Sequence, residues 1–229
     1  MSARPSTADD PSFAPHLAIL ADLYAGTSSP QQAALALSLL CLSHPRELAV
    51  SLIRTWTGII VAARDRPEEH DKLVDLLVSL SLLPDAEDKK GDPILVHGMR
   101  VWRDLPMLGW EFNYEWNGYS VPPTSGPERE RIIQRFTNIN AFTAHLMSTH
   151  HAAFSSFSLF ALWTMRSALE TPPLHAPHNP PEAFIPAAAA WIDILGTQIY
   201  EWDEEFEYGP LIGDGGAGGP LWKGEVHGF

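Results

Sequence analysis

Residues 155–170, SSFSLFALWTMRSALE, decide the fold, because apolar side chains cover every direction of the helix that they form. Only Arg166 and Glu170 interrupt this pattern, at the (i, i+4) spacing of a helical ion pair. A helix that is apolar all round is normally buried among other helices. The stretch therefore predicts a central helix over about 154–170, surrounded by the rest of the fold.

The preceding stretch, RFTNINAFTAHLMSTHH at 135–151, places polar groups on an apolar helix. At 100° per residue, Asn140, Thr143 and His150 share one arc with apolar side chains such as Ile139. A buried amide or imidazole without a partner costs about 1–3 kcal/mol, so these groups need partners. Two interpretations stay open: core residues that hydrogen-bond to neighbouring helices, or the polar lining of a ligand pocket.

Further helices are marked by prolines and capping patterns. Ser29, Pro30 and Gln32 form the N-cap, first position and capping-box partner of one of them. Very short connections between successive helices predict antiparallel neighbours. A less regular aromatic segment follows, with one helix expected around Met99–Asp104 because Pro106 and Gly109 break any longer period. The expected helices lie near 16–25, 30–43, 46–64, 68–83, 127–150, 154–170 and 187–205.

No strand is strongly predicted, so we expect an all-α fold. The helices should form a single bundle-like domain of about seven helices over residues 15–208. Residues 1–14 are polar and contain prolines, which predicts a disordered arm. Residues 209–229 read as a flexible glycine-rich tail that carries the GPLWKG block.

Charge and cysteine content narrow the class of protein. The 229 residues include 15 Lys plus Arg against 28 Asp plus Glu, a formal net charge of −13, which disfavours nucleic acid and anionic membranes as partners. The single cysteine, Cys41, lies in an apolar run and rules out an intrachain disulfide framework. No signal peptide or membrane-spanning run is recognisable, so we expect a cytoplasmic protein.

Tests for cofactor chemistry are mostly negative. We find no glycine-rich phosphate loop, dinucleotide-binding fingerprint or serine nucleophile elbow. His145, His150 and His151 cannot all face one metal ion from one helix. The acidic run DEEFE at 203–207 could hold magnesium, but no second metal motif accompanies it. We therefore expect neither a metal nor a cofactor.

Five blocks resemble a fungal family catalogued as domain of unknown function 3632: WRDLPMLGW, FTNINAFTAHL, FALWTMRSALE, AAAAWIDILGTQIY and GPLWKGEVHGF. They span residues 101–229. The resemblance implies a fungal intracellular protein and leaves its activity unspecified. Because members of the family often continue past the last block, it also implies that a terminal segment is missing after Phe229.

Two function hypotheses follow from these patterns. The first is a cofactor-independent enzyme of fungal secondary metabolism, a cyclase, pericyclase, Diels-Alderase, lyase or isomerase that folds an apolar reactive intermediate in an aromatic-lined cavity. The alternative is a non-enzymatic helical module that binds another protein or a small molecule. A homo-oligomer is compatible with either. The expected catalytic residues are Asn140, His150, Arg166 and Asp193, and the expected pocket residues are Trp102, Trp110, Phe112, Phe136, Thr143, Trp163, Trp191 and Tyr200.

Overall fold

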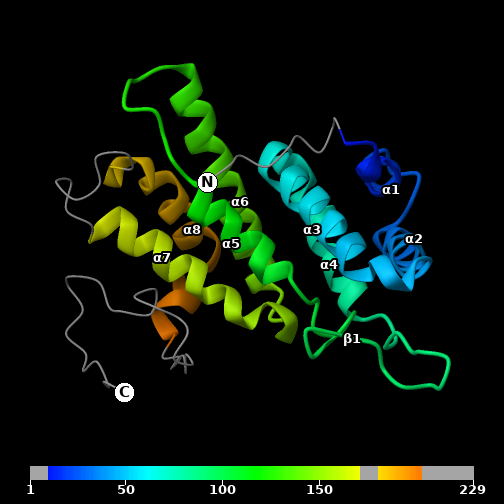
Figure 1. Ribbon diagram of the computed structural model, residues 1–229. Helices are drawn as coiled ribbons and strands as arrows, with labels where there is room; N and C mark the ends of the chain where they lie inside the picture. Colours follow the sequence, from blue (N-terminus) through cyan, green and yellow to red (C-terminus); the bar gives the residue numbers. More distant parts are fainter. Residues whose placement is uncertain (1–9, 171–179, 203–229) are drawn as a thin grey trace. The chain divides into compact units, whose positions relative to one another are not determined.

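The computed structural model describes residues 10–170 and 180–202, and these contain eight α-helices and one short hairpin (Figure 1). The predicted all-α class is confirmed. The chain divides into two compact units, one formed by residues up to 119 together with 145–158, and the other by the remainder. The single domain expected from the sequence stays a prediction. Each unit buries large aromatic side chains of its own, with Trp56 in the first and Trp191 in the second.

The first unit contains five helices, drawn from blue to green in Figure 1. In this unit α2 packs on α1 and α4, while α3 contacts α1, α2 and α5. The short connections join helices that contact one another, but α2 and the segment that begins at Pro45 meet at 99°, so this pair is not antiparallel as the sequence predicts. The helices are α1 (Ala14–Tyr24), α2 (Pro30–Leu42), α3 (Leu48–Asp65), α4 (His70–Ser81) and α5 (Leu108–Gly118).

The start of α2 is fixed by the predicted capping box. The Gln32 backbone N–H donates to Ser29 Oγ at 3.2 Å, and the Ser29 N–H donates to Gln32 Oε1 at 2.9 Å. Pro30 occupies the first helical turn, where it has no intrahelical hydrogen bond to lose. Local sequence alone therefore sets this boundary.

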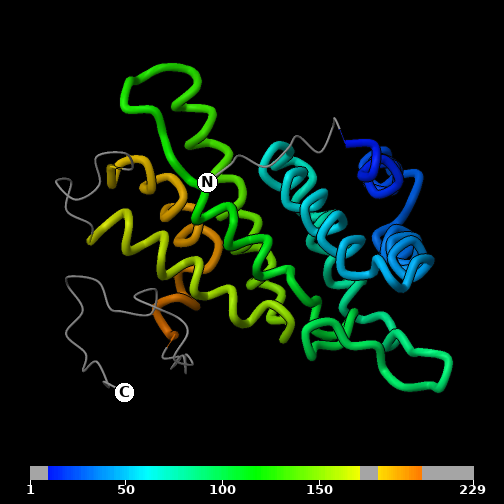
Figure 2. Tube along the Cα trace, viewed as in Figure 1, coloured from blue at the N-terminus to red at the C-terminus, as the bar shows by residue number. Residues whose placement is uncertain are grey.

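The segment between α4 and α5 differs from the sequence expectation. A hairpin of β1 (Leu95–Val96) and β2 (Met99–Arg100) takes the place of the helix predicted around Met99–Asp104, and its turn is visible along the tube in Figure 2. His97 and Gly98 make the two-residue turn with φ values of 53° and 79°. Two successive residues of positive φ are what a tight antiparallel hairpin needs.

Helix α5 lies in the stretch expected to be irregular. Its N-cap residue, Met107, has a left-handed backbone with φ of 67°, so Pro106 and the following turn precede the helix and do not interrupt it. Gly109 falls within the first turn of α5. The sequence predicts an irregular segment here because Pro106 and Gly109 break the helical period, whereas in the structure the backbone turns at Met107 and the helix begins after it.

The second unit contains most of α6 (Pro127–Ser148) and α7 (Ser158–Leu169), together with α8 (Ile185–Glu201). The predicted central helix is shorter than 154–170, since Ala152–Phe157 form a separate 3₁₀ helix. Helix α7 is also not enclosed on all sides, because Leu162 and Leu169 are 48% and 68% exposed. The wheel is apolar all round because the residues that face away from the core, such as Leu162 and Leu169, are themselves apolar.

Several sequence expectations fall outside the described residues. These are most of the N-terminal arm, the DEEFE run at 203–207 and the tail at 209–229. Residues 10–14 of the expected arm are described, and Pro11–Phe13 form a 3₁₀ helix that leads into α1. In the described part of the chain no single helix has the length and apolar character of a membrane span; the bent pair of α2 with the following helical segment passes such a test only when taken together.

Candidate functional sites

Asn140 joins three helices of the second unit. Its side chain is fully buried on α6, and its Oδ1 accepts hydrogen bonds from Thr164 Oγ1 of α7 at 2.8 Å and from Trp191 Nε1 of α8 at 2.7 Å. Its Nδ2 donates to the Phe136 carbonyl at 2.8 Å. Both acceptor positions of the amide oxygen are therefore occupied by protein groups. We call Asn140, Thr164 and Trp191 the Asn140 cluster.

The cluster explains why polar residues share the apolar arc of α6. Thr143, also fully buried, donates to the Ile139 carbonyl at 2.7 Å and so satisfies its hydroxyl within the helix. The Trp191 indole is a donor only, and Asn140 supplies the acceptor that it needs at a fully buried position. As arranged, these groups hold α6, α7 and α8 together.

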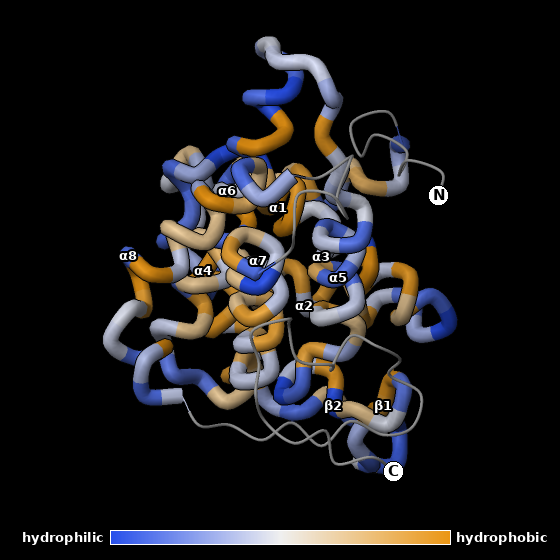
Figure 3. The backbone as a smooth tube through the Cα atoms, turned by 90° about the vertical axis from the view of Figure 1, so that its left-hand side faces the viewer, coloured by the Kyte–Doolittle hydropathy of each residue, from blue (hydrophilic) through white to orange (hydrophobic). Residues whose placement is uncertain are grey.

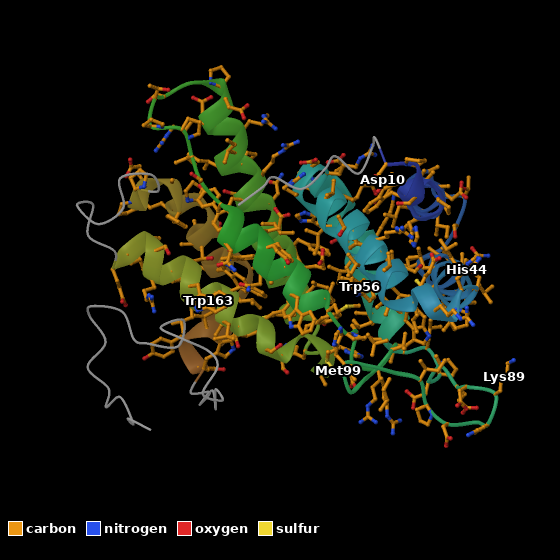
Figure 4. All side chains as sticks on the ribbon, in the orientation of Figure 1. Asp10, His44, Trp56, Lys89, Met99 and Trp163 are labelled. Carbon is orange, nitrogen blue, oxygen red and sulfur yellow. The ribbon has the colours of Figure 1, made fainter. Side chains whose placement is uncertain are left out.

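The other expected site residues of the second unit lie in different environments. Phe136 is buried and meets Phe184 edge to face, with 5.7 Å between ring centroids. Trp163, labelled in Figure 4, and Arg166 are half-buried on α7. Asp193 is exposed on α8, and Tyr200 near its end is 92% exposed. Of the expected residues in this unit, the structure brings Asn140 and Trp191 into direct contact.

The remaining expected site residues belong to the first unit. Trp102 and Phe112 are buried, and the Phe112 ring contacts Phe157 at 4.9 Å. Trp110 is 55% exposed and lies 4.9 Å from the His97 ring. His150 is exposed just after α6, where its φ of 54° ends the helix in a left-handed conformation.

His151, next to His150, has a defined structural role that the sequence did not single out. Its Nδ1 accepts the Ala153 N–H at 3.3 Å, so the ring proton lies on Nε2, which donates to Ser81 Oγ at 3.2 Å. The Ser81 hydroxyl in turn donates to the Val78 carbonyl at 2.7 Å. His151 thus caps its 3₁₀ helix and ties it to the end of α4.

A buried carboxylate was also missed. Glu111 of α5 is 5% exposed, and its Oε2 accepts a hydrogen bond of 2.9 Å from Thr57 Oγ1 of α3. One residue before Thr57 on α3, the Trp56 indole donates to the carbonyl of Pro106, which precedes α5, at 2.9 Å. Glu111 sits between aromatic residues in the sequence, yet a carboxylate there gives no signal that distinguishes it from a surface residue.

Four buried side chains connect α1, α2 and α3. His16 Nε2 lies 3.2 Å from Ser51 Oγ, Ser51 Oγ donates to Cys41 Sγ at 3.4 Å, and Cys41 Sγ lies 3.4 Å from Thr55 Oγ1. Thr55 Oγ1 donates to the Ser51 carbonyl at 3.0 Å. We call these four residues the His16 relay.

Counting protons fixes the direction of the relay. The Thr55 hydroxyl has one proton, which it donates to the Ser51 carbonyl. The Cys41 thiol must therefore be the donor in its hydrogen bond with Thr55. The Ser51 hydroxyl donates its proton to Cys41 Sγ, so its oxygen must accept the hydrogen bond from His16 Nε2–H. His16 Nδ1 is then an unprotonated acceptor, and it is buried with no hydrogen-bond partner in the described part of the chain.

Electrostatics keep the relay neutral. Burial lowers the pKa of His16 and the positive charge of Arg54 lowers it further, although a hydrogen bond with Ser51 opposes that change. Burial also raises the pKa of the Cys41 thiol, although its hydrogen bonds with Ser51 and Thr55 oppose that change. Cys41 is thus a buried, protonated thiol, as its apolar neighbours in the sequence suggest, and has no thiolate for nucleophilic chemistry.

An exposed apolar surface lies on the same unit. Leu35 and Leu39 of α2 are 54% and 72% exposed, and their (i, i+4) spacing places them side by side. We call this pair the leucine face; Figure 3 shows the hydropathy of the chain along the backbone. Residues 25–45, which include all of α2, contain no Asp, Glu, Lys or Arg. The exposed face of α2 therefore carries no charge, although the whole chain has 43 charged residues, 15 plus 28.

Metal binding finds no support in the described residues, which contain no group of three or more His, Cys, Asp or Glu side chains able to hold an ion. The DEEFE run lies outside those residues, so its expected role is untouched by this observation.

Comparison with known proteins gives one result. The family model "Protein of unknown function (DUF3632)" matches residues 56–229, which is more than half of the chain, and the chain belongs to that family. No curated protein and no solved structure matches the chain. The matched region begins at Trp56 within α3, so α1, α2 and the His16, Cys41, Ser51 and Thr55 side chains precede it.

Proposed function

We propose that this DUF3632 member is a cytoplasmic, non-enzymatic helical module that binds an amphipathic helix of a different protein through the leucine face of α2. The observation that carries the proposal is the exposure of Leu35 and Leu39, at 54% and 72%, on a helix without a charged residue. The centres of protein interfaces are depleted of charged residues, whereas ordinary surfaces are not.

Charge selects the kind of partner. The whole chain carries a net charge of −13, but residues 25–45 offer no charge with which to form an ion pair. A partner that relied on basic residues would bind better elsewhere on this acidic protein, and a phosphate-rich partner would be repelled. The surface suits an apolar stripe with i, i+3 and i+4 spacing, which is the pattern of a helix that docks on another helix.

The interior of the second unit supports the same proposal indirectly. A pocket that orients a ligand needs polar groups free to reach it. In the Asn140 cluster, the amide oxygen already accepts from Thr164 and Trp191, and the amide nitrogen donates to the Phe136 carbonyl. These partners support a packing role for Asn140 rather than a role in binding a ligand.

The cofactor-independent enzyme of fungal secondary metabolism remains a second proposal. The buried rings of Phe112, Phe154 and Phe157, which contact one another at 4.9 and 5.9 Å, are the aromatic material that such a cavity would use. Its test compares metabolites of the source organism with and without the gene. Accumulation of one precursor, restored by the wild-type gene but not by His150→Ala or Asp193→Ala, would support it. An unchanged metabolite profile would overturn it.

The interaction proposal is tested by site-specific photo-crosslinking in the source organism. A photoreactive amino acid replaces Leu39 in one strain and Lys89 in a control strain; Lys89 is exposed in the loop after α4 (Figure 4). We expect one defined partner protein at position 39 and none at position 89. The same products at both positions, no product, or a crosslink to a second copy of the chain would overturn the proposal.

The captured partner then allows a quantitative test. Leu39→Glu should weaken binding to the purified partner at least tenfold, since it places a charge in the centre of an apolar contact. Ala189→Glu adds the same charge at an exposed position on α8, away from α2 in the sequence and in the other unit, and should change the affinity much less. Equal losses for both variants would indicate that net charge, and not the leucine face, governs binding.

A further inference from the structure

The direction of the hydrogen bonds in the His16 relay leaves His16 Nδ1 without a donor among the described residues. His16 is 3% exposed, its Nε2–H is committed to Ser51, and its Nδ1 is an acceptor without a partner in the described residues. A buried acceptor in this state loses its hydration without gaining a hydrogen bond in return, which is unfavourable. The environment of His16 Nδ1 is therefore unfavourable even when the ring is neutral.

Adding a proton to Nδ1 makes that environment worse. The ring becomes a cation with a second N–H donor, and no acceptor from the described residues faces that donor. From α3, the charge of Arg54 repels the imidazolium. From α2, Cys41 contributes a neutral thiol. Asp10, beside α1, is attracted to Arg54 and already accepts the Ser12 N–H at 2.9 Å.

We propose that His16 is a proton-uptake site that releases α1 from α2 and α3 when the pH falls. Protonation can be accommodated only if Nδ1–H reaches water, because a buried imidazolium without a counter-charge is too costly to keep. His16 is the polar anchor of α1, so moving it into water moves the helix. Below the pH at which His16 takes up the proton, α1 is undocked while the other helices of the first unit stay in place.

Helix α1 is suited to local release. It has 11 residues, and three of them, His16, Leu20 and Leu23, are buried. The connection to α2 turns at Gly26, whose φ of 71° suits glycine and allows the two helices to separate without unfolding α2. Elements with few buried apolar side chains open at the lowest free energies.

Release would also change the surface available for binding. Because α1 packs on α2, its departure exposes apolar side chains of α2 next to the leucine face. This consequence rests on the proposed function, whereas the release of α1 does not. If partner affinity changed with pH while the hydrogen-exchange protection of α1 did not, the release of α1 would be wrong and the proposed partner binding could still hold.

The release is tested by hydrogen–deuterium exchange of the full chain between about pH 7.5 and about pH 5, the range in which a histidine titrates. Protection factors, corrected for the pH dependence of intrinsic exchange, are compared for residues 14–24 and for α3. In the wild-type protein we expect α1 protection to fall at least tenfold while α3 protection is retained, and to recover when the pH is restored.

Two variants make the assignment specific. His16→Gln retains a side-chain N–H donor for Ser51 but cannot titrate, so α1 should stay protected at about pH 5. His44→Gln, at an exposed histidine between α2 and α3 (Figure 4), should behave as the wild type. Protection of α1 that does not respond to pH in the wild type, or that falls equally in His16→Gln, would overturn the proposal.

A spectroscopic measurement covers the case in which His16→Gln does not fold. In the wild-type protein with ¹⁵N-labelled histidine, the His16 ring at about pH 7.5 should carry its proton on Nε2 and show an unprotonated Nδ1. A proton on Nδ1 at that pH, or a ring charged throughout the range, would contradict the direction of the relay and overturn the proposal.

Discussion

Trp191 of α8 and Asn140 of α6, 51 residues apart in the sequence, meet through a hydrogen bond of 2.7 Å from the indole Nε1 to the amide oxygen. Both side chains are fully buried, and the same oxygen accepts from Thr164. Asn140 is therefore an acceptor that two buried donors share.

Asn140→Leu should lower the free energy of unfolding by about 1–3 kcal/mol, because it removes the acceptor of the buried Trp191 indole N–H. Urea unfolding measures the change. Thr143→Val, which removes a fully buried hydroxyl with one intrahelical hydrogen bond, should cost only about 1 kcal/mol. A double-mutant cycle with Trp191→Phe should show coupling. Strictly additive losses would contradict the shared hydrogen bond.

The buried pair of Thr57 and Glu111 gives a second prediction. Thr57→Val keeps the side-chain shape but removes the donor that lies 2.9 Å from Glu111 Oε2, so we expect a loss of about 1.5–3 kcal/mol, the range for a hydrogen bond to a charged group. Thr57→Ser keeps the hydroxyl and serves as the control, with a smaller loss from the missing methyl group. The prediction fails if Thr57→Ser is the more damaging of the two when thermal unfolding is measured.

Stability should fall with acid through two buried histidines. Burial lowers the pKa of both His16 and His70 below the ordinary value of 6.5, so in each case the unfolded state binds the proton first. Stability is therefore complete above about pH 6.5 and declines below it, with a slope of at most roughly 1.4 kcal/mol per pH unit for each histidine.

Urea midpoints at several pH values check this slope. His16→Gln and His70→Gln should each flatten the dependence between pH 6.5 and the lowered pKa of the missing histidine, and the exposed His44→Gln should not. If the pH dependence of stability is unchanged in both His16→Gln and His70→Gln, the loss of stability in acid comes from carboxylates and not from these histidines.

Local signals made the helices predictable. The Ser29 capping box and the proline at the start of α2 are contained within four residues, and both are found in the structure. The α5 region was not predictable in this way, because the helix depends on a left-handed Met107 that a sequence pattern does not reveal. The division into two compact units could not be predicted either, because a sequence pattern does not show which helices share a core.

Candidate sites were predictable only as far as one helix extends. The wheel of α6 shows that Asn140 points inward, but it cannot show that Thr164 and Trp191 supply the partners. The His16 relay draws on three helices, and His16 and Ser51 are separated by 35 residues. Taken singly, each relay residue looks like an ordinary core position.

Tyr24 provides a last prediction, in which removing a polar group should not harm the fold. Its hydroxyl oxygen is buried with no hydrogen-bond partner in the described residues, while Arg66 lies over the ring at 5.2 Å from its centroid. Tyr24→Phe keeps the ring and its cation–π contact but removes an oxygen that was desolvated without compensation. The free energy of unfolding should therefore stay equal or rise by up to about 1 kcal/mol.

The effect of Tyr24→Phe should grow in alkali. Burial raises the pKa of the Tyr24 hydroxyl well above its ordinary value of 10, with the positive charge of Arg66 opposing the shift and Glu69 adding to it. The unfolded state therefore loses the proton first, and wild-type stability falls above about pH 10, a loss that Tyr24→Phe should escape. Tyr200→Phe, at a residue 92% exposed, should match the wild type throughout. A clear destabilisation by Tyr24→Phe at neutral pH would mean that the hydroxyl holds a bound water.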